Sequence, residues 1–289
     1  MSKIKWDIER LERCICCDSA NFDVVAKTVA RCTKCAVIFN YERPTQETVN
    51  KVYDSYGHYK NFCPDYKWEK LWRDRYSRIL SFCKGLSGSK LLDVGTGIST
   101  FLSFARKDFE VSGTEISFDA VEKAKELYDL DIVHAKVEEA GFKENSFDVI
   151  TFWHVFEHLP LPGESLKYCK RLLKPGGIIC IAVPNESGAK WMLKPWSWFL
   201  SGEKRYKNLS YAVTNQDEFM EVHLVHFTPK SLGGLLESNG FELLELTLDK
   251  NSINPHWKTA VKFFLRRGFI KIFGVNPFET IFVAARLKE

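Results

Sequence analysis

The sequence lacks the features that mark exported and membrane-spanning proteins. Nowhere in its 289 residues is there an uninterrupted apolar run of about 18 residues, the length that a spanning helix needs. The start, MSKIKWDIERLER, is charged and has no apolar core, so a signal peptide is not expected. Internal repeats and low-complexity tracts are also absent. We therefore expect a cytoplasmic chain with no transmembrane segment.

A large excess of charge of either sign is also missing. Lys and Arg total 41 and Asp and Glu total 37, which leaves a formal net charge of +4. Such a small excess does not by itself indicate a nucleic-acid partner. Hydrophobic residues make up 45% of the chain, enough for the core of one large α/β domain with a small appendage.

The pyrophosphate-binding pattern G-x-G-x-x-G does not occur, but a shorter glycine motif is present in KLLDVGTGIST, residues 90–100. An apolar run ends there in Asp93, and Gly95 and Gly97 follow closely. This order predicts a buried strand, a tight turn and a helix N-terminus, the layout of a nucleotide-type ligand site above a parallel sheet. Glycines suit such a turn because they have no Cβ and let the backbone approach a ligand. The missing third glycine favours a ligand without a pyrophosphate.

A carboxylate ends the next apolar run. Glu115 lies near the end of EVSGTEIS, about 20 residues after the glycine motif, where an acidic side chain can accept hydrogen bonds from two ribose hydroxyls. Strand-like and helix-like segments then alternate up to residue 183, which predicts a parallel sheet with right-handed crossovers. Ligands bind such sheets beyond the carboxyl ends of the strands. We therefore expect Asp93, Glu115 and the WHVFEH segment to converge.

Four sequence blocks, LLDVGTGIST, GTEIS, NSFDVITFWHVFEHL and LLKPGGIICIAVPN, resemble those of class I S-adenosylmethionine-dependent methyltransferases. They follow the family's order across residues 86–185, and HFTPKSLGGLLESNGFELLEL, residues 226–246, resembles its late segment. The resemblance implies an α/β fold with a Rossmann-like seven-stranded methyltransferase sheet, in which the last strand, residues 279–287, runs antiparallel. It also implies S-adenosylmethionine as the methyl donor.

Four of the nine cysteines form two C-x-x-C pairs, Cys14 with Cys17 and Cys32 with Cys35. Two such pairs at this separation fit a four-cysteine zinc ribbon, in which four thiolates surround one tetrahedral Zn²⁺ ion. Because so short a segment buries little apolar surface, the metal would stabilise it, and four cysteines leave no open position for catalysis. Free structural thiols and a redox C-x-x-C pair are the alternatives, and the role of Cys16 stays open.

Composition and pattern divide the chain into three parts. These are a zinc ribbon at residues 1–43, a helical linker or lid at 44–85, and a Rossmann-like methyltransferase domain at 86–289 with an aromatic-rich insertion at 186–222. The insertion is expected to roof a substrate pocket, with an oligomer contact or a membrane-surface patch as alternatives. Tyr56 and Tyr59 in the linker are either packing residues or part of a lid that contacts the substrate.

The family resemblance implies roles for the residues around the donor. Gly95 and Gly97 would border its methionine end, Asp93 would anchor the loop and the amino group, and Glu115 would hold the ribose hydroxyls. The family often places an aspartate near the adenine amino group, where this chain has Lys136. The remaining predicted donor contacts are therefore Ile116 against the adenine, the backbone around Val137 or the side chain of Glu138, and His154.

An acceptor hydroxyl or acidic carbon needs a base, and His158 is the predicted one. It follows the carboxyl end of a predicted strand, and imidazole titrates near neutral pH. Glu157 beside it would orient the substrate or the imidazole, and the resemblance also allows the Glu157–His158 pair to serve as metal ligands. His154, with Glu157 and Glu186 nearby, is a further candidate site for a divalent metal. The alternative for His158 is a buried core histidine. His226 in VHLVHF is a candidate substrate contact, with a structural role as its alternative.

The sequence therefore favours a methyltransferase that acts on a small molecule, such as a nucleotide-linked sugar or another biosynthetic intermediate. It resembles sugar C-methyltransferases and biosynthetic O-methyltransferases, including those of quinones. The alternatives are an RNA methyltransferase that recognises RNA through its zinc module, and a non-catalytic S-adenosylmethionine-binding protein. Only Lys27 and Arg31 are basic in the loop between Cys17 and Cys32, which argues against RNA. An oligomer is compatible with the sequence.

Overall fold

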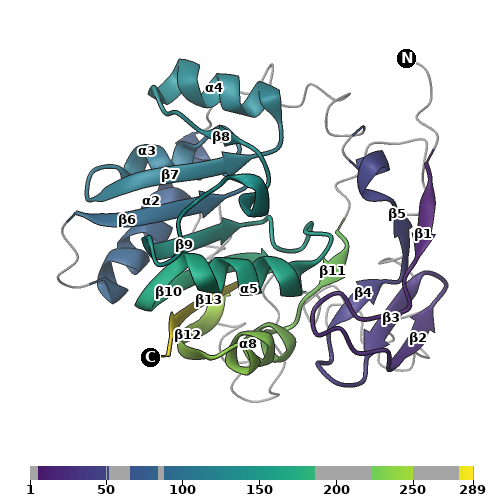
Figure 1. Ribbon diagram of the computed structural model, residues 1–289. Helices are drawn as coiled ribbons and strands as arrows, with labels where there is room; N and C mark the ends of the chain where they lie inside the picture. Colours follow the sequence, from purple (N-terminus) through teal and green to yellow (C-terminus); the bar gives the residue numbers. More distant parts are fainter. Residues whose placement is uncertain are drawn as a thin grey trace, which may run out of the picture.

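The computed structural model describes residues 6–49, 51, 66–83, 88–185, 223–249 and 280–288. Tyr56, Tyr59 and the insertion at 186–222 lie outside the described residues, so the expectations for them stay predictions. Figure 1 shows a large sheet with helices on both faces and a smaller body of strands beside it. Among the described helices there is no candidate for a membrane span.

The large sheet has seven strands in the order β12-β13-β10-β9-β6-β7-β8. The strands from β10 to β8 run parallel to one another, and β13 runs antiparallel to both β10 and β12. The predicted Rossmann-like seven-stranded sheet, including its antiparallel last strand, is thus confirmed. Its strands are β6 (Ser89–Val94), β7 (Phe109–Glu115), β8 (Val133–His134), β9 (Phe147–Trp153), β10 (Leu173–Pro184), β12 (Phe241–Asp249) and β13 (Thr280–Leu287).

Alternating side chains of the central strands fill two separate cores, one on each face of the sheet. In β10, Ile179 and Ile181 belong to one core, and Ile178 and Cys180 belong to the other. Because both faces are buried, a ligand can reach this sheet only at the strand ends. The helices are α5 (Pro162–Leu172) and α8 (Pro229–Ser238) on the first face, α2 (Tyr66–Phe82) and α3 (Thr100–Ala105) on the second, and α4 (Phe118–Tyr128) beside β7 and β8 (Figure 1).

The N-terminal strands form the smaller body, and a strand from far downstream completes it. Its main sheet has the order β11-β4-β3-β2, in which β11 pairs antiparallel with β4. A second small sheet joins β1 to β5. The strands are β1 (Ile8–Arg10), β2 (Phe22–Ala26), β3 (Val29–Cys32), β4 (Ile38–Asn40), β5 (Glu42–Pro44) and β11 (Val225–His226).

The smaller body packs directly on the start of α5. The Gly163 N–H donates to the Ile15 carbonyl at 3.2 Å, and a Cβ at Gly163 would lie 2.2 Å from the Cys16 carbonyl oxygen. Only glycine allows this close approach. Phe39 of the smaller body and Phe156 of the larger one also belong to the same hydrophobic core. The two bodies therefore share one continuous core.

Candidate active site

The glycine turn joins β6 to α3 in the predicted order. Gly95 and Gly97 have φ angles of +67° and +55°, in the left-handed region that glycine adopts with little strain. A Cβ at Gly95 would also lie 2.6 Å from Cγ2 of Val155, so a side chain has no room here. Val155 belongs to the loop after β9, so the absence of a side chain at Gly95 lets that loop pack closely against the turn.

Glu115 ends β7 and binds the glycine turn through its carboxylate. Its Oε2 accepts a hydrogen bond from the Gly97 N–H at 2.8 Å, and its Oε1 accepts from Ile116 and Ser117 at 2.8 and 2.9 Å. Burial raises the pKa of Glu115, while these three N–H donors act in the opposite direction. A carboxylate oxygen can accept two hydrogen bonds. Glu115 therefore fixes the turn and keeps acceptor capacity for a ligand hydroxyl.

Asp93 is buried at the end of β6, below the glycine turn. Thr151 of the neighbouring strand β9 donates to Asp93 Oδ1 at 2.6 Å. Burial raises the pKa of Asp93 to about 7, although hydrogen bonds from Thr151 and Thr96 and the charge of Arg75 oppose the rise. The carboxyl therefore exchanges its proton near neutral pH, and a cationic ligand group beside it would favour the ionised form.

This pKa predicts how stability depends on pH. An unfolded aspartate has a pKa near 3.8, so the folded chain binds one more proton between that pH and about 7. The stability contributed by the protonated carboxyl is complete below the unfolded pKa of 3.8. It is lost as pH rises through the folded pKa of about 7. Between pH 5 and pH 8 the wild type should lose about 3 kcal/mol more than Asp93→Asn. Urea unfolding at both pH values measures this, and identical pH dependence of the two proteins would contradict it.

A second polar group follows β9. His154 has a φ angle of +58°, and backbone strain of this kind in a residue with a side chain clusters at functional sites. Its Nδ1 lies 3.6 Å from Glu157 Oε1, and His158 Nε2 lies 4.0 Å from the same oxygen. The His158 ring also packs edge-on against His223, with ring centroids 4.9 Å apart. Imidazoles therefore surround one carboxylate.

Glu157 itself is buried, and neither of its carboxylate oxygens has a hydrogen-bond partner within the described residues. Burial alone would raise the pKa of Glu157, but contact with His154 and the charges of His158 and His223 lower it below its ordinary value. One ligand atom from each of Glu157, His158 and His223 lies within 4.8 Å of the others. Such a cluster fits either proton transfer or a divalent cation.

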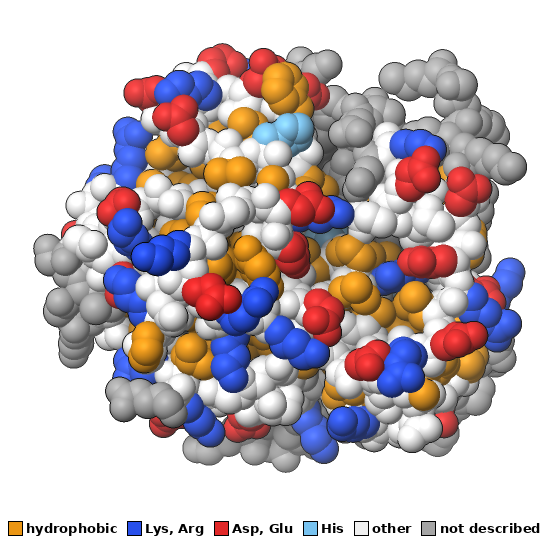
Figure 2. Space-filling model, viewed as in Figure 1, with side chains coloured by type: hydrophobic (Ala, Val, Ile, Leu, Met, Phe, Trp, Pro, Cys, Tyr) orange, Lys and Arg blue, Asp and Glu red, His pale blue; other side chains and the backbone are white. Residues whose placement is uncertain are grey.

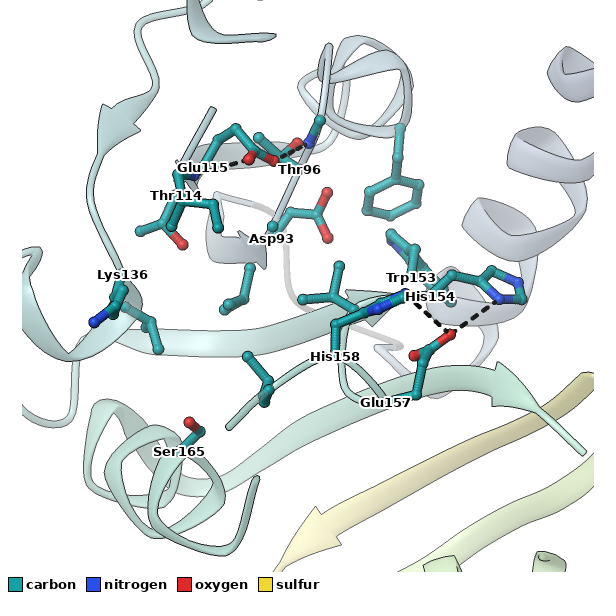
Figure 3. A pocket seen from close by; sticks show the side chains of 18 of the residues that line it. Asp93, Thr96, Thr114, Glu115, Lys136, Trp153, His154, Glu157, His158 and Ser165 are labelled. Carbon is teal, nitrogen blue, oxygen red and sulfur yellow. Dashed lines mark hydrogen bonds and ion pairs between the residues drawn. The ribbon is translucent and has the colours of Figure 1, made fainter. Parts of the chain in front are cut away.

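Both polar groups face one cavity of about 1180 Å³. Figure 3 shows Asp93, Thr96 and Glu115 on one side of it and His158 and Glu157 on the other. Pockets for one small ligand measure about 300–1,000 Å³, so this cavity has room for two reactants. The predicted site residues that line it are Asp93, Gly95, Gly97, Glu115, Ile116, Val137, His154, Glu157 and His158.

The two histidines of the VHLVHF segment, His223 and His226, lie in different surroundings. His226 is 3% exposed in β11, where it pairs with Ile38 of β4, and it is not among the described residues that line the cavity. His223 does line the cavity. The substrate contact proposed for this segment therefore fits His223 better than His226.

The four predicted zinc ligands lie together in the smaller body. The Sγ atoms of Cys14 and Cys35 are 3.6 Å apart, those of Cys17 and Cys32 are 3.5 Å apart, and all four lie within 4.8 Å of one another. Zn–S bonds of about 2.3 Å place sulfurs of a tetrahedral site about 3.8 Å apart. The arrangement therefore fits a four-coordinate zinc ion. Cys16 is buried but does not belong to this group.

Arg75 is a cavity residue that our sequence reasoning missed. It lies on α2, is 1% exposed, and its guanidinium stacks over Trp72 and Trp153 at 5.1 and 4.8 Å from the ring centroids. Its Nη2 lies 3.2 Å from His154 Nε2. A buried cation in a cavity is a candidate partner for an anionic ligand group. One signal was available, because Leu71 and Ile79 lie one helical turn to either side and mark the buried face.

Comparison with known proteins agrees with this geometry. Residues 65–246 match the family described as "Methyltransferase domain". The chain is 35% identical over 127 residues to a ubiquinone biosynthesis O-methyltransferase of Escherichia coli O157:H7, a match that covers 41% of this chain. The chain spans about half of the length of the curated relatives it matches, 52% in this case.

Solved structures share the fold. An S-adenosylmethionine-dependent methyltransferase from Archaeoglobus fulgidus has a TM-score of 0.51 at 17% identity, with 75% of this chain and 93% of that one covered. The [4+2]-cyclase SpnF has a TM-score of 0.55 at 17% identity, with 85% and 97% covered. At such identities the likeness establishes the fold, and the reaction must be argued from the site.

Proposed function

The chain belongs to the methyltransferase-domain family, and from this premise we propose that it transfers a methyl group from S-adenosylmethionine to a hydroxyl of a small biosynthetic acceptor. The observation that carries the proposal is the single cavity in which the glycine turn and Glu115 face the Glu157–His158–His223 cluster. The donor supplies a methyl group on a positively charged sulfur. The protein must then hold donor and acceptor in line and exclude water.

The donor half consists of the strand ends around the glycine turn. Glu115 accepts a hydrogen bond from a ribose hydroxyl through Oε2, and Ile116 and Val137 pack against the adenine. Asp93 holds the donor amino group, and the glycines leave space for the methionine chain. Arg75 pairs with the donor carboxylate, because it is a buried cation of the cavity wall whose charge acts on Asp93.

The acceptor half lies around His158. Its imidazole takes the proton from the acceptor hydroxyl, and the buried carboxylate of Glu157 stabilises the imidazolium that forms. His223 packs on the His158 ring and bounds the acceptor. An O-methyltransferase among the relatives supports a hydroxyl as the methylated group, and a nucleotide-linked sugar remains an acceptor class to test alongside ring hydroxyls.

A second candidate for the same reaction places a divalent cation in the acceptor half. The distances within the Glu157–His158–His223 cluster support it, since all three ligand atoms lie within 4.8 Å. These side chains would hold the ion, and it would lower the pKa of a bound hydroxyl. In this version His158 is a ligand rather than a base.

Zinc in the four-cysteine cluster is structural in our proposal. Four thiolates complete its coordination, so it has no position for a substrate. The body that carries it packs on α5 and shares its core, and Figure 2 shows Lys and Arg interspersed with Asp and Glu on the face in view. The mixed charge on this face (Figure 2) supports a small-molecule acceptor rather than RNA.

Calorimetry with S-adenosylhomocysteine, the demethylated donor, tests the donor half. We expect the wild type to bind it and Glu115→Gln to bind about 100-fold more weakly, because a hydrogen bond to a charged group contributes about 1.5–3 kcal/mol. Glu110→Gln is the matched control, since this exposed residue of the same strand pairs with Lys90 at 3.0 Å, away from the cavity. Absence of binding heat with the wild type would refute the proposed function, and unchanged affinity in Glu115→Gln would remove the ribose role.

A further inference from the structure

Asn40, the last residue of β4, crosses from the smaller body to the segment that carries His223. Its side chain is fully buried, and its Nδ2 donates a hydrogen bond to the His223 carbonyl at 2.9 Å. Its backbone N–H donates to the Leu224 carbonyl at 3.0 Å. Because the His223 partner is a carbonyl oxygen, which can only accept, the amide nitrogen of Asn40 and not its amide oxygen must face His223.

The other edge of the same segment is bound to the loop after β9. The N–H groups of Leu224 and Val225 both donate to the Glu157 carbonyl, at 2.9 and 3.1 Å. Residues 223–225 therefore lie between Asn40 on one side and Glu157 on the other. Three parts of the chain that are distant in sequence are joined by backbone hydrogen bonds at the acceptor half of the cavity.

The stability of β4 alone does not account for an amide at this position. Asn40 Oδ1 is buried and has no hydrogen-bond partner within the described residues. A buried polar atom left in this state costs about 1–3 kcal/mol. The benefit of the side chain therefore lies in its amide nitrogen, which donates to the backbone carbonyl of His223.

We propose that Asn40 is a positioning residue of the acceptor half, which holds His223 against His158 and Glu157. The inference deepens the proposed function and rests on it for its catalytic meaning. It gives the smaller body a role in the reaction, because β4 of that body fixes the position of His223 in the acceptor half. A misplacement of about 1 Å in such a site can cost about 100-fold in rate.

Nuclear magnetic resonance of histidine-labelled protein tests this without an acceptor. The rings of His158 and His223 are close enough for a cross-peak between their protons, which His158→Gln and His223→Gln assign. In Asn40→Ala and in the isosteric Asn40→Asp we expect this cross-peak to be lost. Tyr41→Phe is the matched control, because it removes a hydrogen bond inside the smaller body, to the Lys27 carbonyl at 3.2 Å, and should keep the cross-peak.

Melting temperature, zinc content and affinity for S-adenosylhomocysteine are measured on the same variants. The proposal predicts that zinc content and this affinity stay near the wild-type values in both variants, and that the melting temperature does so in Asn40→Ala, while the ring contact is lost. A retained cross-peak in both Asn40 variants overturns it, and so does loss of zinc or of the folded state in both, since Asn40 would then be a structural residue. Failure of the wild type to bind S-adenosylhomocysteine would overturn the proposed function instead, because the ring measurement needs no donor.

Discussion

Replacing Cys32 with serine is expected to release zinc from the smaller body and to unfold it. Zinc binding in small cysteine-rich modules contributes about 10–16 kcal/mol, so one lost thiolate removes the largest single stabilising interaction of this part of the chain. The effect should extend to the acceptor half, because β4 holds residues 223–226. We expect a lower melting temperature and loss of bound zinc, measured by calorimetry and by metal analysis.

Cys16→Ser is the control for this experiment. Cys16 is buried, like the ligands Cys14 and Cys32, but is not one of the four clustered cysteines. This variant should keep its zinc and a melting temperature near that of the wild type. Zinc retention in Cys32→Ser, or equal loss in both variants, would contradict the assignment of the four ligands.

His158→Ala is expected to reduce methyl transfer by about 10²–10⁴-fold, the usual contribution of a general base. The donor half stays intact, so affinity for S-adenosylhomocysteine should not change. The measurement is release of S-adenosylhomocysteine with a panel of hydroxylated acceptors that includes ring hydroxyls and nucleotide-linked sugars. His226→Gln is the matched control, because His226 lies in β11 outside the described cavity lining. A normal rate in His158→Ala would remove His158 from its proposed role.

His158→Ala also distinguishes the two proposed roles of His158, general base and ligand of a divalent cation. If His158 is a base, the rate of the variant should rise with pH, because an acceptor hydroxyl that ionises by itself no longer needs the imidazole. If His158 is a ligand, added Mn²⁺ or Mg²⁺ should restore part of the rate at constant pH by filling a weakened site. Rescue by neither treatment would leave an orienting role for this histidine.

The strand ends could be predicted from sequence because parallel sheets follow simple rules. Apolar runs that end in Asp93 and Glu115 are placed at the same sheet edge by right-handed crossovers, and the structure has both residues on the cavity wall. The spacing of the two C-x-x-C pairs was likewise sufficient to predict that their four cysteines lie together, as they do in the structure. These features depend on local pattern and on a topology with few alternatives.

Contacts between distant segments could not be predicted in the same way. Whether His223 or His226 faces the cavity depends on how β11 pairs with β4, and nothing local to VHLVHF fixes that register. In the sequence Arg75 looks like an ordinary polar residue of a helix. Only the structure shows that it stacks on Trp72 and Trp153. Asn40 and Gly163 become informative only when their partners across the two bodies are in view.

The late arrival of β11 has a consequence for biosynthesis. The ribosome releases the cysteine-rich segment well before residues 225–226, and the outer edge of β4 stays uncovered until those residues pair with it. Until then this edge offers unpaired N–H and C=O groups to other nascent chains. A fragment that ends after residue 44 would keep that edge open permanently, so self-association is its expected fate even with metal bound.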